Sequence, residues 1–479
     1  MVDCQINKVF LLVFLLCSMG VNARQVSVSS ASAIKDGSWQ AGDTLVMQDG
    51  VWTDQKISIT ATGTVSEPVV LRAATAGGVH LTGSSQLTVN GAWVEVNGLV
   101  FEGTYTGKSH AITFAKGTRN CRLTETVIRG YSPADPTVDT KWVSLYGKGH
   151  RVDHCLFENK TNMGTLLVVW LETDIVPAHR IDNNIFGYRT ANMDENGKEL
   201  NGQEIIRIGD SSTSMQQAAC IVEDNWFKQC DGEIEVVSNK SCGNTYRHNT
   251  FFACAGMLTL RHGNGCTVEE NCFYGTQKAG SGGVRVIGED HVVRGNYMQD
   301  LAGNNYRAAI CLVRGKANSA LNEYFQVKNA TIEGNIMVNC KEAFSVNYHS
   351  ATGCTLPPVN TRIADNIIYN DADHKSNYCV SIADTTAVEI EWEDNRANQG
   401  KYKNTTASAL GILSCTAADA ECSLLLKPEE EVGPRWMHWD TSTENNYAEI
   451  PFAAKQHDIQ MGIFTLCIRN GQKFLKITR

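Results

Sequence analysis

A six-residue pattern recurs along the middle of the chain and constrains its fold more than any other feature. Each copy has an apolar residue, two variable residues, an asparagine, a variable residue and a final apolar residue. The clear copies are IDNNIF from Ile181, VEDNWF from Val222, YRHNTF from Tyr246, VEENCF from Val268, VRGNYM from Val293, IEGNIM from Ile332 and IADNII from Ile363. Weaker copies extend the pattern backwards as LTETVI from Leu123 and VDHCLF from Val152.

The spacing of the copies indicates the size of the repeating unit. Asn225, Asn249, Asn271 and Asn296 follow one another at steps of 24, 22 and 25 residues, and longer steps elsewhere fit the same unit with loop insertions. Each unit holds short β-type runs separated by Gly and Asn, without a helical period. We therefore predict an all-β solenoid, a parallel β-helix whose residues stack on their equivalents about 4.8 Å away.

The recurring asparagine is expected to form an internal amide ladder at a turn, because stacked amides satisfy one another in a buried corner. Cys230, Cys254 and Cys340 each lie five residues after such an asparagine and are predicted to be stacked core thiols. A disulfide between Cys230 and Cys254 is sterically conceivable but not required. Removing Cys4 and Cys17 from the 17 cysteines leaves an odd number, and the chain has no zinc-type CxxC pair.

The two ends of the chain differ from the repeat. Residues 1–23 have a basic start, a short apolar run and small residues before Ala23, which predicts a secretory signal and a secreted or periplasmic protein. A membrane anchor or a lipoprotein at Cys17 are the alternatives, and no other stretch is long and apolar enough to cross a bilayer. We expect a β-helix over residues 24–385 and an irregular cap or packed extension over 386–479.

The formal charge of −9 argues against nucleic acid as a partner, because phosphate binding needs a basic surface. An anionic substrate remains compatible with a local basic cleft.

Charged residues gather on two neighbouring coils. When the asparagines are superposed, Glu233 and Glu235 fall at the level of Met257 and Thr259, and strand alternation places both glutamates on the outer face with Thr259 and Arg261. Flanking coils add arginines to the same column, and a lysine follows at the turn that closes the strand. These are Arg207, Arg285 and Lys240.

Two adjacent carboxylates between arginines predict a calcium site in a basic groove, with Asn201 as a third ligand. Taken alone, Glu233 and Glu235 also fit a solvated strand face, Lys240 a surface lysine, His262 a turn residue and Tyr324 a core residue. Their combination on adjoining coils favours a groove that binds an acidic polymer.

Five segments resemble one known family: NGQEIIRIG, CDGEIEVVSNKSCGNTYRHNTF, LTLRHGNGCTVEENCF, GGVRVIGEDHVVRGNY and NEYFQVKNATIEGN. They are similar to polysaccharide lyase family 6, the alginate lyases and chondroitinase B, over roughly residues 25–385. LTLRHGNG and IRIG look more like the alginate lyases. The resemblance implies a right-handed parallel β-helix.

The resemblance also implies roles for individual residues. Calcium would be bound by Asn201, Glu233 and Glu235, with Lys240 as general base and Arg261 as general acid. Substrate would be bound by His262, Arg207, Arg285, Tyr324 and Tyr146. The implied reaction is β-elimination, in which calcium and arginines neutralise the uronate carboxylate while a neutral Lys240 removes the C5 proton. Because a guanidinium rarely gives up its proton, Arg261 is expected chiefly to stabilise the leaving oxygen, with water or His262 completing proton transfer.

Several functions share these residues. We expect a monomeric alginate lyase that favours mannuronate-rich polymer, with endo or exo action open. An alginate C5-epimerase would abstract the same proton, a dermatan sulfate lyase would act on another uronate polymer, and a non-catalytic β-helix would only bind the acidic glycan.

Overall fold

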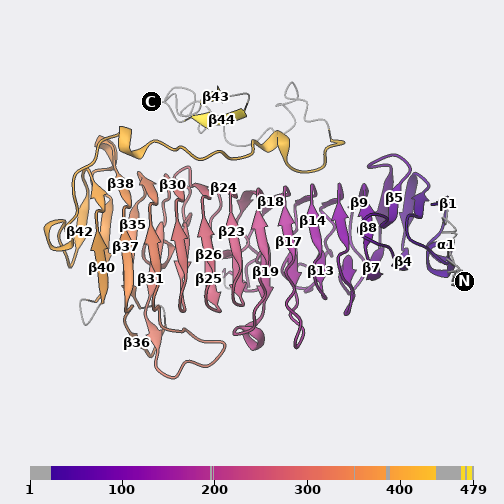
Figure 1. Ribbon diagram of the computed structural model, residues 1–479, viewed down its shortest axis with the longest axis horizontal. Helices are drawn as coiled ribbons and strands as arrows, with labels where there is room; N and C mark the ends of the chain where they lie inside the picture. The colour runs from indigo at the N-terminus through magenta and orange to yellow at the C-terminus, as the bar shows by residue number, and fades with distance from the viewer. Residues whose placement is uncertain are drawn as a thin grey trace, which may run out of the picture.

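The chain winds through three long parallel sheets, one strand of each sheet per coil, and forms the right-handed parallel β-helix that the sequence predicts (Figure 1). The computed structural model describes residues 23–194, 197, 199–349, 351–384, 389–437, 465–469 and 472–476. The predicted signal segment lies outside these described residues, apart from Ala23. Within them, no helix combines the length and apolarity needed to cross a bilayer.

The first sheet carries most of the charged residues singled out above and is called the site sheet. Its strands are β4 (Lys56–Thr62), β7 (Gln86–Ala92), β10 (Ile112–Phe114), β13 (Val143–Leu145), β16 (Leu167–Val169), β19 (Ile206–Gly209), β22 (Glu235–Lys240), β25 (Met257–His262), β28 (Val284–Val286), β31 (Ile310–Val313), β35 (Glu342–Tyr348), β39 (Tyr378–Ile382) and β42 (Lys401–Lys403).

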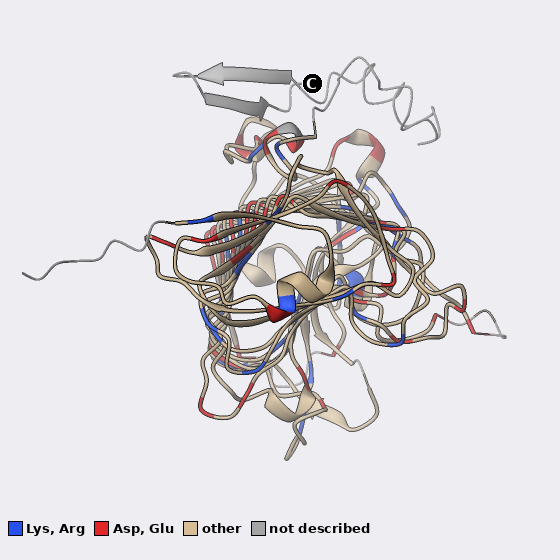
Figure 2. Cartoon of the chain, turned by 90° about the vertical axis from the view of Figure 1, so that its right-hand side faces the viewer, with Lys and Arg blue, Asp and Glu red and all other residues tan. Residues whose placement is uncertain are grey.

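The other two sheets complete each coil, and looking along the axis the coils superpose (Figure 2). The second sheet contains β1 (Gln25–Val28), β2 (Thr44–Met47), β5 (Val69–Ala73), β8 (Val94–Asn97), β11 (Arg122–Thr124), β14 (Arg151–Asp153), β17 (Arg180–Asp182), β20 (Ile221–Glu223), β23 (Thr245–Arg247), β26 (Thr267–Glu269), β29 (Val292–Arg294), β33 (Thr331–Glu333), β37 (Thr361–Ala364) and β40 (Ile390–Glu393). The third contains β3 (Gly50–Thr53), β6 (Val79–Thr82), β9 (Leu99–Glu102), β12 (Val127–Arg129), β15 (Leu156–Glu158), β18 (Ile185–Arg189), β21 (Trp226–Cys230), β24 (Thr250–Phe252), β27 (Cys272–Tyr274), β30 (Tyr297–Gln299), β34 (Ile336–Val338), β38 (Ile367–Tyr369) and β41 (Arg396–Ala397).

The recurring asparagine occupies the turn between the second and third sheets and forms the predicted ladder. The Asn225 side chain donates to Asn249 Oδ1 at 3.0 Å and to the Ile181 carbonyl at 2.8 Å. The final position of the pattern stacks too, and the rings of Phe227 and Phe251 lie 4.5 Å apart and nearly parallel. Ladder members in the described chain are Asn184, Asn225, Asn249, Asn271, Asn296, Asn335, Asn366 and Asn395.

The predicted core thiols are buried and free, and Cys230 and Cys254 lie next to each other on neighbouring coils. The backbone N–H of Cys230 donates to Cys254 Sγ at 3.5 Å. Cys340 occupies the same position further along the helix and is also buried.

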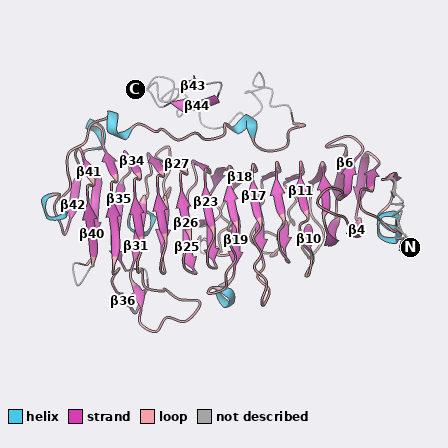
Figure 3. Cartoon of the chain, in the orientation of Figure 1, coloured by secondary structure: helices cyan, strands magenta, loops and turns pink. Residues whose placement is uncertain are grey.

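Helical segments lie at the ends and in loops, outside the stacked strands (Figure 3). α1 (Ala31–Asp36) begins where the Ser30 hydroxyl accepts the Ala33 N–H, and it buries Ile34 against the first coil. The short 3-10 turns are η1 (Ser211–Thr213), η2 (Asn305–Arg307), η3 (Ala372–His374), η4 (Ser408–Leu410), η5 (Ala418–Ala420) and η6 (Glu429–Glu431). Two small antiparallel pairs, β32 (Gly315–Lys316) with β36 (Cys354–Leu356) and β43 (Thr465–Arg469) with β44 (Gln472–Lys476), complete the elements.

The coils continue past residue 385, where the repeat fades in the sequence, through one more coil of β40, β41 and β42. Leu410 and Ile412 then pack against the core at this end of the helix.

The following residues, 415–437, run back along the third sheet and are called the strap (Figure 1). Strap residues cover apolar side chains on the outside of that sheet, and the Trp226 indole donates to the Lys427 carbonyl at 2.9 Å. Arg435 pairs with Glu125, many coils away from the point where the strap begins. The C-terminal segment therefore packs against the end of the solenoid and along one side of it.

Candidate active site

Four neighbouring strands of the site sheet align one column of polar side chains. Arg207 of β19 pairs with Ser238 of β22, Ser238 pairs with Thr259 of β25, and Thr259 pairs with Arg285 of β28. This register confirms the predicted column of Arg207, Thr259 and Arg285.

The predicted level of the two glutamates is wrong. Glu235 pairs with Met257 rather than Thr259, and Glu233 precedes the strand. The reason is a β-bulge, because Val236 is an extra residue of β22 between the pairs formed by Glu235 and Val237. Bulges re-aim side chains and are common beside active sites.

A second bulge restores the register on the opposite strand. Asn239 pairs with Leu260, whereas Lys240 pairs with His262, so Arg261 is an extra residue of β25. The two bulges displace the carboxylate of Glu235 and the guanidinium of Arg261 from the regular column and bring them together, with Arg261 Nε 3.8 Å from Glu235 Oε1.

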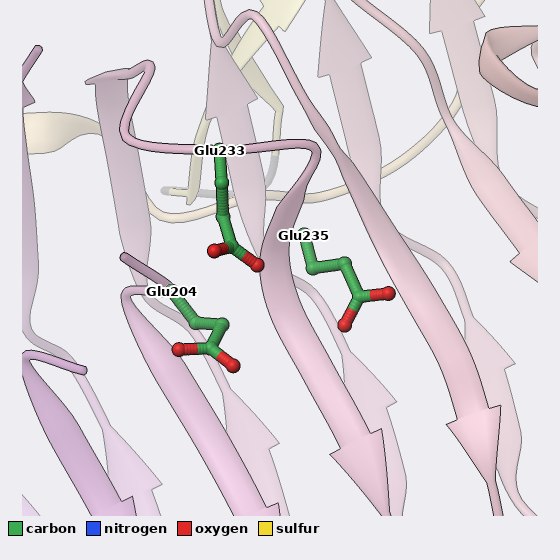
Figure 4. Close-up of side chains that lie close together, drawn as sticks. All are labelled: Glu204, Glu233 and Glu235. Atoms are coloured by element: carbon green, nitrogen blue, oxygen red, sulfur yellow. The ribbon is translucent and has the colours of Figure 1, made fainter. Parts of the chain in front are cut away.

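Three glutamates form a cluster in which a ligand oxygen from each lies within 4.8 Å of the others (Figure 4). The members are Glu204, Glu233 and Glu235, and they are 2%, 6% and 7% exposed, so the cluster is buried and the alternative of a solvated strand face is excluded. Glu204 was missed from the sequence, although it lies in NGQEIIRIG three residues before Arg207. Asn201, the predicted third ligand, is exposed, and its role stays a prediction.

Burial and mutual repulsion make the cluster electrostatically costly. Burial, then the charge of Glu204 and that of Glu235, raise the pKa of Glu233 to about 8, although the N–H groups of Gly202 and Gln203 stabilise its carboxylate. Arg285 pairs with Glu235 at 2.5 Å, and Lys240 Nζ lies 3.7 Å from Glu204 Oε1. These two cations border the cluster and pair with Glu235 and Glu204, but neither pairs with Glu233.

The cluster fits a hard divalent cation. Calcium takes carboxylate oxygens at about 2.3–2.6 Å, so ligands on opposite sides of one ion lie about 5 Å apart. The observed oxygen spacing matches this requirement, and an added positive charge would compensate the buried carboxylates. The residues present can therefore hold a metal ion.

Lys240, Arg261 and His262 stand together at the ends of β22 and β25. Arg261 Nη1 donates to His262 Nε2 at 2.8 Å and to the Glu323 carbonyl at 2.8 Å. Burial, then the positive charges of Arg261 and Lys240, lower the pKa of His262 to about 3, so the imidazole is neutral at neutral pH. Burial also lowers the pKa of the Arg261 guanidinium.

Tyr324 reaches the same group from the loop after β32. The Arg261 guanidinium lies over its ring, 4.4 Å from the centroid. Tyr324 also packs against a small apolar cluster that contains Cys311. The sequence left open whether this tyrosine belongs to the core or the site, and the structure shows contacts with both.

Several buried polar atoms at the column lack a hydrogen-bond partner. Within the described residues, atoms that lack a hydrogen-bond partner include Arg207 Nε, Thr259 Oγ1, His262 Nδ1 and Arg285 Nε. Buried polar groups in proteins are almost always paired, so unmet donors on one surface indicate a site for a polar ligand.

Tyr146 lies on an earlier coil of the helix, directly after β13. Its ring stacks on Trp170, 5.9 Å away and 14° from parallel, and the Arg207 guanidinium lies 5.1 Å from the centroid of a Trp170 ring. Tyr146 is thus linked to the column through Trp170, which the sequence analysis did not single out.

Comparisons with known proteins agree with this arrangement. A family model described as Chondroitinase B matches residues 27–430. The structure of the PL6 family alginate lyase AlyGC is 32% identical, with a TM-score of 0.76, over 86% of this chain and 59% of that one. A mannuronic acid specific polysaccharide family 6 lyase from human gut microbiota is 28% identical, with a TM-score of 0.73, over 86% and 96% of the two chains.

A further PL6 alginate lyase, solved in complex with a trisaccharide, is 26% identical, with a TM-score of 0.70, over 86% of this chain and 95% of that one. No curated protein matches the sequence at a significant level.

The fold is a right-handed parallel β-helix, as it is in these solved lyases. The chain belongs to the chondroitinase B family and is similar in structure to the alginate lyases of polysaccharide lyase family 6. It spans 59% of the length of AlyGC.

Proposed function

We propose that this protein is an exported, calcium-dependent alginate lyase that cleaves mannuronate-rich polymer by β-elimination and leaves 4,5-unsaturated ends. The observation that carries the proposal is the convergence of Lys240, Arg261 and Arg285 on a buried three-carboxylate cluster. Such a group combines a base, fixed positive charges and a cation site on one sheet. The similarity to a mannuronic acid specific lyase supports the choice of polymer block.

The first chemical task is removal of the C5 proton of a uronate residue. Lys240 is suited to it, because its amine ends beside Glu204 at the edge of the column and its neutral form accepts a proton. Its side chain is 19% exposed, which leaves it within reach of a bound sugar.

The second task is stabilisation of negative charge on the substrate carboxylate. Arg207 and Arg285 each present an unpartnered Nε on the column, and preorganised donors of this kind stabilise charge that develops in the transition state. A calcium ion held by Glu204, Glu233 and Glu235, with Asn201 as the predicted further ligand, would act as a Lewis acid toward the same carboxylate.

The third task is departure of the O4 oxygen. Arg261 is held by the Glu323 carbonyl and the Tyr324 ring, so it can offer a fixed hydrogen bond to that oxygen. His262 accepts from Arg261 through Nε2, which leaves Nδ1 as the protonated nitrogen of the neutral ring. If His262→Ala leaves turnover intact while Arg261→Lys abolishes it, His262 takes no part in proton transfer.

The test is ultraviolet absorbance over time with mannuronate-rich alginate, guluronate-rich alginate and dermatan sulfate. We expect a rise on alginate, fastest on mannuronate-rich polymer, that a chelator abolishes and added calcium restores. Lys240→Ala should lower the rate by about 10²–10⁴-fold, the usual contribution of a general base. Lys35→Ala, on exposed α1, is the matched control and should match the wild type.

Other outcomes would assign other functions. A rise only on dermatan sulfate would identify a dermatan sulfate lyase. This polymer is tested because the chain belongs to the chondroitinase B family. Epimerised product without an absorbance rise would identify a C5-epimerase, and binding without any chemistry would identify a glycan-binding β-helix.

A further inference from the structure

A charged side chain that takes no part in the three chemical tasks is buried beside the glutamate cluster. Arg189 is the last residue of β18, pairs in register with the core thiol Cys230, and is 0% exposed. Burial lowers the pKa of its guanidinium to about 10, whereas the charges of Glu204 and Glu233 raise it, so the group is charged at neutral pH. A buried charge is costly unless its contacts compensate it, so the contacts of Arg189 indicate its role.

The contacts of Arg189 join the turns of three successive coils. Its Nη2 donates to the carbonyls of Asn162 and Gly164, before β16, at 3.1 and 2.8 Å. Its Nη1 donates to the Glu204 carbonyl, before β19, at 2.9 Å. Its own carbonyl accepts the N–H of Asp231, before β22, at 2.7 Å. Arg189 therefore fixes these turns relative to one another.

The turn before β19 carries one carboxylate of the cluster and orients another. Glu204 belongs to this turn, and its Oε2 accepts the Thr165 hydroxyl at 2.7 Å. The N–H groups of Gly202 and Gln203, in the same turn, donate to Glu233 Oε2 at 2.7 and 2.8 Å. By holding the Glu204 carbonyl, Arg189 fixes the turn on which the positions of both carboxylates depend.

The residue before Glu233 leaves room for this guanidinium. A Cβ at Gly232 would lie 3.0 Å from Arg189 Nε and 2.6 Å from the Gln203 carbonyl oxygen. The second distance is too short for a carbon beside a backbone oxygen, so the close packing of these two turns around Arg189 requires glycine. Arg189 thus lies between the turn that carries Glu204 and the turn that carries Glu233.

We propose that Arg189 is a positioning residue for the cation, which holds Glu204 and Glu233 at the oxygen spacing that one calcium ion requires. The inference rests on the proposed function in taking calcium as the ion. Arg189 bonds to the backbone that carries the ligands and to none of the proposed catalytic residues. Its loss should therefore weaken calcium binding and leave proton removal by Lys240 intact once the ion is bound.

Arg189→Lys is the variant that tests this role, because it keeps the charge while a single ammonium cannot reproduce the planar fork that reaches two coils. Calorimetry on chelator-treated protein should show calcium affinity about 10–100-fold weaker, the usual effect of losing a group that orients metal ligands. The calcium concentration that gives half-maximal ultraviolet absorbance rise should increase by the same factor. At saturating calcium, kcat should stay within about threefold of the wild type.

Lys160→Met is the matched control. Lys160 is also buried and donates to the same Asn162 carbonyl at 2.9 Å, but its other acceptors, Asn162 Oδ1 and the Met163 carbonyl, belong to the turn before β16. A general loosening of the core would therefore appear in both variants, and thermal unfolding of the chelated proteins measures it. The calcium affinity of Lys160→Met should match that of the wild type.

Two results would overturn the inference: equal calcium affinity of Arg189→Lys and the wild type, or equal weakening in Arg189→Lys and Lys160→Met. If Arg189→Lys fails to fold, Gly232→Ala takes its place, because the added methyl group intrudes on the same contact from the facing turn. Gly232→Ala should then weaken calcium binding, and an unchanged affinity would refute the role of Arg189.

Calcium binding and cleavage are measured separately, so failure of the inference and failure of the proposed reaction can be told apart. Weakened calcium binding in Arg189→Lys, with no absorbance rise by the wild type on any polymer, would refute the lyase and keep the inference. Cleavage with unchanged calcium affinity in Arg189→Lys would refute the inference and keep the lyase. A wild type that binds no calcium would refute the inference, and the absorbance assay would still decide whether the protein is a lyase.

Discussion

The asparagine ladder and the polar column of Arg207, Thr259 and Arg285 both place polar side chains inside the protein, but only the ladder satisfies them internally. In the ladder, Asn249 donates to the Val222 and Arg247 carbonyls and accepts from Asn225. In the site, Thr259 Oγ1 and the Nε atoms of the column arginines have no partner. Buried polar groups that are paired within the chain stabilise the fold, whereas groups left unpaired are available to a ligand. The following predictions test this difference, from the largest effect to the smallest.

Asn249→Ala should lower the free energy of unfolding by about 3 kcal/mol, because it leaves several buried backbone groups without partners. Thermal and urea unfolding measure the change. Asn304→Ala is the matched control, since Asn304 is exposed and its side chain makes no capping bond. Equal stability of the two variants would mean that the ladder contributes nothing to folding.

Glu233→Gln should weaken the pH dependence of stability in metal-free protein. A carboxyl whose pKa is raised in the folded state costs no stability at acid pH and costs progressively more as pH rises from its unfolded value toward about 8. Chelated wild type should therefore lose about 2 kcal/mol between pH 6 and pH 8, and Glu233→Gln should lose much less. Calcium should remove this loss of stability in the wild type only. If the two proteins lost equal stability between pH 6 and pH 8, the raised pKa of Glu233 would be contradicted.

His150 should give the opposite pH response. Burial lowers its pKa to about 4, so the neutral ring contributes stability above its unfolded pKa that is lost as pH falls toward 4. Its Nδ1 accepts the Cys121 N–H, as Asn244 Oδ1 accepts the Cys220 N–H elsewhere in the same column of turns. When the pH falls from 7 to 5, His150→Asn should therefore lose about 2 kcal/mol less stability than the wild type. Thermal unfolding at pH 7 and pH 5 measures the difference.

Thr259→Val should stabilise the protein by about 1 kcal/mol, because it replaces a buried hydroxyl that has no partner with a methyl group of the same size. A loss of stability would show that the Thr259 hydroxyl has a hydrogen-bond partner in solution. Thr259 would then stabilise the fold, as the ladder asparagines do.

The repeat could be predicted from the sequence because successive coils from Asn184 to Asn395 place an asparagine at the same turn, and that regularity also gives the sheet column of Arg207, Thr259 and Arg285. The level of Glu235 could not be predicted, because Val236 and Arg261 are extra residues in facing strands and their shifts cancel beyond the site. Counting from one asparagine to the next detects no anomaly when two bulges compensate.

Glu204 and Trp170 were missed for a different reason. Glu204 lies two residues before β19, after the long loop that follows β18, and Trp170 lies directly after β16, so both stand outside the strands whose level the asparagine register fixes. The sequence feature that could have pointed to Glu204 is its place three residues before Arg207, in a segment already singled out. The strap has no period at all, and its path along the third sheet depends on single contacts such as Arg435 with Glu125.

The strap fixes how many coils this molecule can have. It contacts Glu125 through Arg435 and Asn183 through Lys427, and it leaves the helix at the last coil. Duplicating or deleting one coil between these points would displace every contact beyond it by about 4.8 Å. Solenoids usually evolve by gaining and losing repeats. Here such a change requires a matching change of strap length, so the length of the strap limits the number of coils.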